Sequence, residues 1–483
     1  RAFLKTVTAD NATATAAVTG AAAAVVAATA VGVVGTTFAL TKSVDTLTGT
    51  NANDVFIAGD DGGSSSLSAG DTIKGGEGTD TLRIFNTAAL ANSANFATAS
   101  ISSVENVEVA FAGVQTLDVS ANADVVKATV AAGTGGTVTL NLKQQAGLTG
   151  AVTTATALVY NGAAGAADTA TLNVTGATLT GGLTVANIET LNIVATGANT
   201  LGNLNAAAAE KLVITGAGSL NTTLVGTAAK TIDGSTATGN LVINNAAAVA
   251  AVQSIKTGTG ADVYTTTYAA LTKEDVIDLG AGSDSLRFSD AATFNDATTK
   301  AQLTGVTNVE QLGTVNNTLT VDGDFVTQTS FYASGAAAKL VLNNVANAST
   351  LTFGVTDVAA NATGANTVAL KLGANTLNVN LEGAATGASV VGGLVGTVGD
   401  GLAVTGSAIV NVKSSGIAGQ PDNVLDLTAA DNQSVVVTGS QNLTLVSKAA
   451  TGTTGFSIDG SAFTGKLTVT GTAAADIIKG GSG

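Results

Sequence analysis

Short runs of alternating apolar and polar residues recur along most of this chain. Between Glu189 and Ile243 they read TLNIV, TLGNL, KLVIT, SLNTTLV, KTIDG and NLVIN, separated by Gly, Ala, Asn and Thr turns at intervals of roughly 8–12 residues. Alternation with a period of two, rich in Val, Ile, Leu and Thr, is typical of short β-strands with one buried face. Strands of this length and spacing fit either a β-sandwich or a solenoid.

The solenoid is the favoured interpretation because alternation is short and long hairpins are missing. Thr- and Asn-bearing runs such as TVTLNL at 137–142 and TLNVNL at 376–381 would supply side chains that stack in rows on successive coils. The predicted fold class is all-β, an elongated parallel β-helix or β-solenoid-like array of repeat modules.

A glycine-rich acidic cassette occurs twice and begins a third time. The first copy contains LTGTNANDVFIAGDD and GDTIKGGEGTDTLRIF, the second contains KTGTGADVYTTTY and EDVIDLGAGSDSLRFS, and the third reads TGTAAADIIKGGSG. Gly49, Gly258 and Gly471 mark equivalent positions in the three copies, so the two intervals are nearly equal. A long repeat of this kind predicts an array of similar modules.

Weaker echoes extend the repeat beyond the cassettes. NVE recurs at 106–108 and 308–310, and IDGS recurs around Asp233 and Asp459, at spacings slightly shorter and slightly longer than that of the cassettes. Such drift is expected from insertions in loops. The predicted organisation is an Ala-rich connector at 1–44, a first β-repeat module at 45–253, a second at 254–466, and the truncated start of a third at 467–483.

The connector contains the run AAAAVVAATAVGVVG at 21–35, whose length invites a membrane-span interpretation. Ala and Thr dominate it and large apolar residues are few, so membrane insertion would be weakly favourable at best. We therefore predict a helical or extended connector and no membrane span. Any anchoring domain is expected upstream of Arg1, in agreement with the missing initiator methionine.

The residue types that the sequence lacks limit the catalytic and metal-binding chemistry open to this protein. The sequence includes no His, Cys, Met or Trp. Without His there is no ordinary general base near neutral pH, and without Cys there is no thiolate or disulfide. We therefore predict no catalytic site. The remaining ligands are the oxygens of Asp, Glu, Asn and Thr and of glycine carbonyls, which select hard cations and calcium first among them.

Acidic residues concentrate in the first cassette, where the segment 45–80 holds seven of them. The net charge of −15 excludes a nucleic-acid partner bound through its phosphates. Carboxylates packed this densely repel one another unless a cation offsets their charge, so we predict that divalent cations complete the fold or the assembly.

GGEGTD at 75–80, LGAGSDSL at 279–286 and ADIIKGGSG at 475–483 resemble the glycine-aspartate nonapeptide of the RTX family. In that family, glycine carbonyls and aspartate carboxylates of adjacent turns bind calcium, and the apolar residue after the aspartate points inward. The resemblance therefore implies RTX-type calcium-binding loops, with Leu82 and Leu286 as the inward residues. The motifs are solitary or preceded by a half-motif, which favours a few calcium sites over a long β-roll. Together with the neighbouring acidic residues, the candidate calcium positions are Asp54, Asp60, Asp61, Asp71, Gly75, Gly78, Asp80, Asp262, Asp275, Asp278, Gly280, Gly282, Asp284 and Asp476.

Several of these residues have a plainer interpretation. Asp54 and Asp262 would also serve as caps of glycine-rich turns, because Asp is favoured in such loops. Outside the candidate set, Asp233 and Asp459 are better explained as Asx-turn residues than as ligands.

The charged residues near the cassettes are also open to plainer interpretations. Arg83 and Arg287 follow the inward leucines and are expected to pair with carboxylates on the strand surface. Glu108 and Glu310 are either solvated strand ends or lattice contacts.

The sparse nonapeptides together with LTGT, VENVE and IDGS strings are similar to the RTX-containing S-layer proteins of Gram-negative bacteria. That resemblance implies a secreted, extracellular protein, exported by type I secretion, that assembles with copies of itself into a lattice on the cell surface. Cell-surface polysaccharide or lipopolysaccharide would be its further partner, through a region absent from this sequence.

Three other functions share some of these features. The stalk of a calcium-dependent RTX adhesin would share the repeats, but would need a ligand-binding module at its tip. An ice-binding solenoid would need a Thr-x-Thr string in strict register, whereas the spacing here is irregular. An exported hydrolase would need a nucleophile elbow or a metal motif, and the lack of His argues against it.

Overall fold

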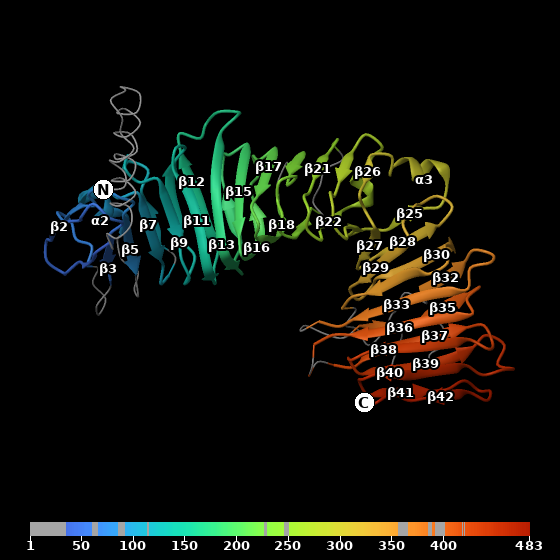
Figure 1. Ribbon diagram of the computed structural model, residues 1–483. Helices are drawn as coiled ribbons and strands as arrows, with labels where there is room; N and C mark the ends of the chain where they lie inside the picture. Colours follow the sequence, from blue (N-terminus) through green and yellow to red (C-terminus); the bar gives the residue numbers. More distant parts are fainter. Residues whose placement is uncertain are drawn as a thin grey trace, which may run out of the picture. The chain divides into compact units, whose positions relative to one another are not determined.

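The computed structural model describes residues 35–483 apart from 60–65, 86–91, 114, 227–228, 246–250, 356–365, 385–388, 392–400, 418 and 420. The chain winds into parallel stacked coils, and each strand pairs with the strand one coil away rather than with its neighbour in sequence (Figure 1). About 18 such turns form a β-solenoid. The predicted all-β parallel solenoid is confirmed.

The chain divides into two compact units, Arg1–Ala186 and Asn187–Gly483. The module boundaries at 45, 254 and 467 describe recurrence in the sequence, which a division by compactness does not test, and they stay a prediction.

The described residues of the first unit form three rows of parallel strands and one short helix. The longest row consists of β1 (Thr37–Ala39), β3 (Val55–Ala58), β5 (Thr81–Phe85), β7 (Asn106–Ala110), β9 (Lys127–Val130), β11 (Gln145–Val152) and β13 (Thr169–Leu179). The other elements are the row β2 (Thr46–Thr48), β4 (Thr72–Lys74) and β6 (Ser100–Ser102), the row β8 (Thr116–Asp118), β10 (Thr137–Asn141), β12 (Thr156–Asn161) and β14 (Leu183–Val185), and α2 (Asn92–Thr98).

The second unit follows the same plan with longer rows. Its first row consists of β15 (Thr190–Thr196), β17 (Lys211–Thr215), β19 (Thr231–Asp233), β21 (Ser254–Lys256), β23 (Val276–Asp278) and β26 (Val306–Thr307). Its second row consists of β16 (Ala198–Asn205), β18 (Ser219–Leu224), β20 (Leu241–Asn244), β22 (Val263–Thr266), β24 (Ser285–Phe288), β27 (Gln311–Val315), β29 (Ser330–Ser334), β31 (Ser349–Phe353), β33 (Thr376–Glu382), β36 (Ile409–Ser415), β38 (Ser434–Gly439), β40 (Ser457–Phe463) and β42 (Ile477–Lys479).

A third row in this unit consists of β25 (Ala292–Phe294), β28 (Thr318–Asp322), β30 (Lys339–Val345), β32 (Asn366–Leu370), β35 (Leu402–Thr405), β37 (Asn423–Ala429), β39 (Leu443–Ala449) and β41 (Leu467–Thr470), with β34 (Val390–Val391) paired to β37. Two short helices, the 3₁₀ helix η2 (Tyr268–Ala270) and α3 (Ala297–Ala301), interrupt the strands.

The core is built from rows of inward side chains stacked coil upon coil. Phe56, Leu82, Val107 and Ala128 occupy matching register positions on β3, β5, β7 and β9, and all are buried. Each large apolar side chain buried in this way contributes roughly 1.5–3 kcal/mol. Leu82 and Leu286 point inward as predicted, both fully buried.

The strand predictions hold at the level of individual runs. TLNIV, KLVIT and NLVIN lie in β15, β17 and β20, and TLNVNL lies in β33. One step of the expected stacking of polar side chains is present, because Asn411 Nδ2 on β36 donates to Asn378 Oδ1 on β33 at 2.9 Å.

Coil length varies widely while strand register is kept. Thr37 pairs with Val55, whereas Asn366 pairs with Leu402 through a coil that is twice as long. Register is kept in both coils, as expected of a stacked fold that accommodates insertions in the connections between its strands.

No helix in the described part of the chain is long and apolar enough to cross a membrane. The Ala-rich run at 21–35 lies almost entirely outside the described residues.

Candidate functional site

The glycine-rich turns of each cassette stack directly on one another. In the first cassette the turn that precedes β3 lies against the turn that precedes β5, with Gly49 N donating to Lys74 O at 2.7 Å. A Cβ on Gly49 would lie 1.9 Å from Gly75 O, and a Cβ on Gly75 would lie 1.6 Å from Ser103 O. Only glycine allows backbones to approach this closely, which explains why these positions are glycine.

An acidic residue ends each of these turns, immediately before the next strand. We call Asp54, Asp80 and Glu105 the first carboxylate ladder. Asp80 Oδ1 accepts the Asp54 N–H at 2.7 Å, and Glu105 Oε2 accepts the Asp80 N–H at 2.8 Å. Each of these two accepting carboxylates therefore holds the backbone of the preceding coil.

The second cassette repeats this arrangement. We call Asp262, Asp284 and Glu310 the second carboxylate ladder. Asp284 Oδ1 accepts the Asp262 N–H at 2.7 Å, and Glu310 Oε2 accepts the Asp284 N–H at 2.8 Å. The spacing between ladder members in the sequence differs between the two cassettes, yet the hydrogen bonds are the same.

Asp71 and Asp275 lie in a separate pair of stacks, although each precedes its ladder aspartate by one nonapeptide step. Asp71 accepts the N–H groups of Asp45 and Ser68, at 2.9 and 2.7 Å. Asp275 accepts those of Gln253 and Thr272, both at 2.7 Å. The nonapeptide step therefore spans a strand and the turn that follows it.

The residue four positions before the aspartate distinguishes two kinds of turn. Thr50 donates its N–H to Asp54 Oδ2 at 2.5 Å, and Thr472 donates its N–H to Asp476 Oδ2 at 2.7 Å. The threonine hydroxyls donate to the same carboxylates. Since Oδ1 of Asp54 also accepts the Thr36 N–H, both of its oxygens are satisfied.

The corresponding positions before Asp80, Asp262 and Asp284 are glycines: Gly76, Gly258 and Gly280. Glycine has no hydroxyl, and within the described structure Oδ2 of all three aspartates is buried without a hydrogen-bond partner. Thr257 and Gly258 approach Asp262 without completing a hydrogen bond to Oδ2.

The carboxyl pKa values follow this division. Burial raises the pKa of Asp54, but the N–H groups of Thr50 and Thr36 outweigh burial and the net pKa is lowered. At Asp476 burial likewise raises the pKa, but the N–H of Phe456 and the side chain and N–H of Thr472 outweigh it, so the net pKa is again lowered.

Burial dominates at the three aspartates preceded by glycine. It raises the pKa of Asp80, helped by the charges of Glu105 and Asp54, and it raises the pKa of Asp262. The pKa of Asp284 rises to about 6, through burial and the neighbouring charges of Asp262 and Glu310. A buried carboxylate oxygen without a donor is stabilised by a proton or by a cation.

The donor chemistry therefore fits a cation at Asp80, Asp262 and Asp284. No group of three or more acidic side chains in the described regions is placed to hold a metal ion. A cation here would take most of its ligands from backbone carbonyls, as calcium readily does. Both carboxylate oxygens of Asp54 accept hydrogen bonds, so Asp54 caps its turn.

The remaining candidate positions shape the turns. Gly78 and Gly280 have φ of 117° and 83°, in the left-handed region that favours glycine. A Cβ on Gly282 would lie 1.9 Å from Gly260 O. Asp278 Oδ1 accepts the Asn308 amide at 2.7 Å. Asp60 and Asp61 lie outside the described residues.

Glu105 is the ladder member that sequence reasoning missed. The shared NVE string aligns Glu108 with Glu310, whereas by hydrogen bonding Glu105 is the equivalent of Glu310. A signal was present, because Val104-Glu105-Asn106 and Val309-Glu310-Gln311 both lead into a strand. Glu108 lies on the outer face of β7 instead, where its carboxylate pairs with Arg83 at 2.9 Å, as expected for that arginine.

The other singled-out residues have structural roles. Asp233 and Asp459 accept the N–H of Ser235 and Ser461 at 3.3 and 2.9 Å, which confirms the predicted Asx turns. Arg287 lies over the ring of Tyr332 at 3.6 Å from its centroid, a cation–π contact where a carboxylate partner was expected.

No protein-family model matches this chain, and no curated protein is significantly similar to it in sequence.

Proposed function

We propose that this chain is a structural S-layer protein of the RTX type, which assembles with copies of itself into a calcium-dependent two-dimensional lattice on a bacterial outer surface. The observation that carries the proposal is the set of buried, unpartnered carboxylate oxygens on stacked glycine turns at Asp80, Asp262 and Asp284. In a chain with net charge −15, a divalent cation at these turns would offset repulsion and fix the stacking of the coils.

The residues that would hold calcium are these three aspartates together with the carbonyls of the turns around them. Calcium would supply charge neutralisation and cross-linking between coils. The chain's own residues provide the rest, because the glycines permit close stacking and Oδ1 of Asp80 and of Asp284 holds the preceding coil in place.

The solenoid also supports a structural role. Parallel coils present outer faces of short polar side chains, such as the amide row of Asn378 and Asn411, on a backbone that is hydrogen-bonded from coil to coil. Such faces are suited to side-by-side packing of copies. An extracellular location is part of this proposal, because the calcium sites of extracellular modules bind at roughly 0.1–1 mM.

Electron microscopy of the purified chain tests this proposal, at about 5 mM calcium and again after chelation. We expect ordered sheets with calcium and dispersed particles without it. The triple variant D80N/D262N/D284N should form no sheets, whereas D233N, which alters an exposed Asx turn, should assemble normally. Discrete rods under both conditions would contradict the lattice and favour an adhesin stalk.

A further inference from the structure

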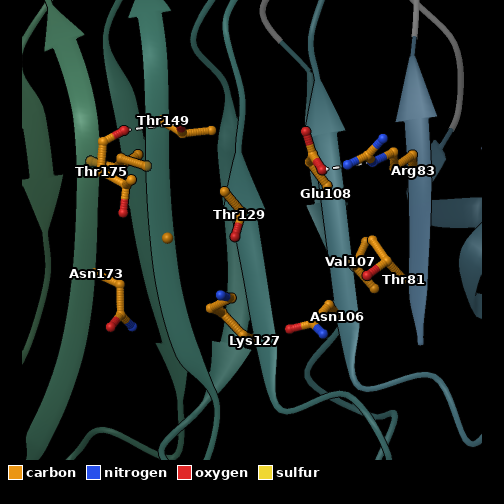
Figure 2. Close-up of a pocket in the computed structure, with 12 residues that line it drawn as sticks. Thr81, Arg83, Asn106, Val107, Glu108, Lys127, Thr129, Thr149, Asn173 and Thr175 are labelled. Carbon is orange, nitrogen blue, oxygen red and sulfur yellow. Dashed lines mark hydrogen bonds and ion pairs between the residues drawn. The ribbon is translucent and has the colours of Figure 1, made fainter. Parts of the chain in front are cut away.

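A polar groove crosses the outer face of the long strand row in the first unit. It has a volume of about 300 Å³ and spans β5, β7, β9, β11 and β13. Figure 2 shows side chains from these neighbouring strands bordering one hollow, among them Lys127, Thr129 and Asn173. It lies on the outer strand faces, and its residues Thr81 and Asn106 directly follow the ladder residues Asp80 and Glu105.

Gly147 forms the floor of this groove. The register aligns Glu108, Thr129, Gly147 and Asn173 in one row across four strands. Every other member of the row projects a side chain outward, so the glycine leaves a gap between Thr129 and Asn173. A Cβ on Gly147 would lie 2.4 Å from Thr129 Oγ1, which shows how closely the neighbouring side chain borders the gap.

Several polar groups in the groove are uncommitted. The side chains of Asn106, Lys127, Thr129 and Thr175 form no hydrogen bond or ion pair with any part of the chain that the structure describes. Asn173 is held in place, because its Nδ2 donates to Gln145 Oε1 at 2.9 Å. The groove therefore combines fixed and available donors and acceptors on adjacent strands.

The groove is locally cationic on an acidic chain. Arg83 is neutralised by Glu108 at 2.9 Å, which leaves the half-buried Lys127 as the uncompensated charge among the groove residues that the structure describes. The net charge of the whole chain is −15. One isolated cation flanked by amides and hydroxyls suits a ligand that places one acidic group against it and has many hydroxyls.

We propose that this groove binds an acidic saccharide, with a uronate carboxylate at Lys127 and sugar hydroxyls at Asn106, Thr129 and Asn173. Asn106 pairs in register with Lys127 on the neighbouring strand, a step of about 4.8 Å that is close to the length of a sugar ring. Thr129 lies two residues further along the strand of Lys127, and Asn173 lies two strands away. The volume, at the low end for small-ligand sites, accommodates a segment of one or two rings.

Other classes of ligand fit less well. A peptide strand would need an unpaired sheet edge, but β7, β9 and β11 each pair on both sides. A nucleic acid would need several phosphate-binding cations, and the described groove offers one. The proposal is independent of calcium and of lattice assembly.

Calorimetric titration of the full chain with digalacturonate and with uncharged digalactose tests the proposal. We expect roughly millimolar binding of digalacturonate, at least tenfold tighter than that of digalactose. K127Q should weaken digalacturonate binding roughly tenfold, the effect of losing one charge-assisted hydrogen bond. K413Q, which removes an exposed lysine on the face of β36, is the matched control and should bind like the wild type.

Each alternative result overturns the proposal. The chain would bind neither sugar, or bind both sugars equally tightly, or K127Q and K413Q would change digalacturonate binding to the same extent. Sedimentation of the sugar-free chain identifies the rival occupant, because a K127Q effect on self-association without an effect on sugar binding would make the groove a contact between copies. Far-UV circular dichroism checks that both variants are folded.

Discussion

The residue four positions before each buried aspartate correlates with whether its carboxylate is satisfied. Threonine four positions before the aspartate supplies two donors to Asp54, whereas glycine at that position leaves Oδ2 of Asp284 without a partner. Five turns that look alike in sequence are therefore of two electrostatic kinds. Replacing aspartate by the isosteric asparagine should affect the two kinds of turn in opposite ways.

Asp284→Asn is expected to stabilise the calcium-free protein at pH 7. The folded-state pKa of Asp284 is about 6 against an ordinary value of 3.8, so folding favours the protonated form and stability falls as pH rises through this interval. Asparagine keeps an acceptor for the Asp262 N–H but carries no charge. Calorimetry at pH 4 and pH 7 should show the melting temperature of the variant gaining on the wild type as pH rises, and a constant difference would contradict the account.

Asp54→Asn is the matched variant and should behave in the opposite way. The lowered pKa of Asp54 means that its contribution to stability is full above the ordinary value of 3.8 and is lost as pH falls through the folded-state pKa. At pH 7 we expect a loss of about 1–3 kcal/mol in the free energy of unfolding, from weaker hydrogen bonds to Thr36 and Thr50. The loss should shrink at the acid end of the titration, and an equal loss at every pH would argue for a packing defect.

Calcium stoichiometry gives a third test at the residue scale. Titration calorimetry at neutral pH should show one fewer calcium ion bound by D284N than by the wild type, because the variant loses the unpaired anionic oxygen. D54N should retain the wild-type number. An equal loss in both variants would show that capping aspartates also ligate calcium.

At the scale of the element, the stacked turns depend on close approach of backbones. Gly75→Ala would place a Cβ 1.6 Å from Ser103 O and 2.4 Å from Asp80 Oδ2, so the turn must move. We expect a destabilisation of roughly 3 kcal/mol, measured by urea unfolding. Gly59→Ala is the control, since nothing lies within 4 Å of the place its methyl group would take, and it should be neutral or slightly stabilising. Similar effects of both changes would refute the stacking argument.

The sequence is sufficient to predict the strands but not their pairing. Alternation identified β15, β17 and β20, because a half-buried strand repeats every two residues. The partner of each strand depends on the number of residues in one coil. That number changes from coil to coil, because the connections between strands differ in length. For the same reason nothing in the nonapeptide step reveals that Asp71 and Asp80 belong to different stacks.

The candidate site was predictable in its residue types more than in its geometry. The aspartates of GGEGTD and LGAGSD do lie at turns, buried against glycine. Glu105 was missed because it lies only three residues before Glu108. The shared NVE string aligns Glu310 with Glu108, although Glu310 is the equivalent of Glu105 in its hydrogen bonding. Whether an aspartate oxygen is satisfied depends on backbone direction in the turn, which a pattern does not contain.

For the molecule as a whole, charge is the feature that couples distant coils. The chain carries a net charge of −15 in a fold in which each coil touches chiefly its neighbours. In calcium-free buffer, raising NaCl from about 10 to about 200 mM should raise the melting temperature by screening repulsion. Calcium at about 1 mM should raise it further than sodium of matched ionic strength. Identical effects of the two salts would leave general screening as the whole explanation.

The freedom of coil length combined with fixed register also constrains how such a chain changes over evolution. The coil from Thr37 to Val55 is half as long as the coil from Asn366 to Leu402, and both keep their strands in register. Deleting one residue early in β33 would instead turn Leu377, Val379 and Leu381 from the interior to solvent. Related genes should therefore tolerate insertions in the connections between strands, and the loss or duplication of whole coils. Single-residue deletions within a strand should be removed by selection. The connections between strands are accordingly the places at which an epitope can be inserted for display.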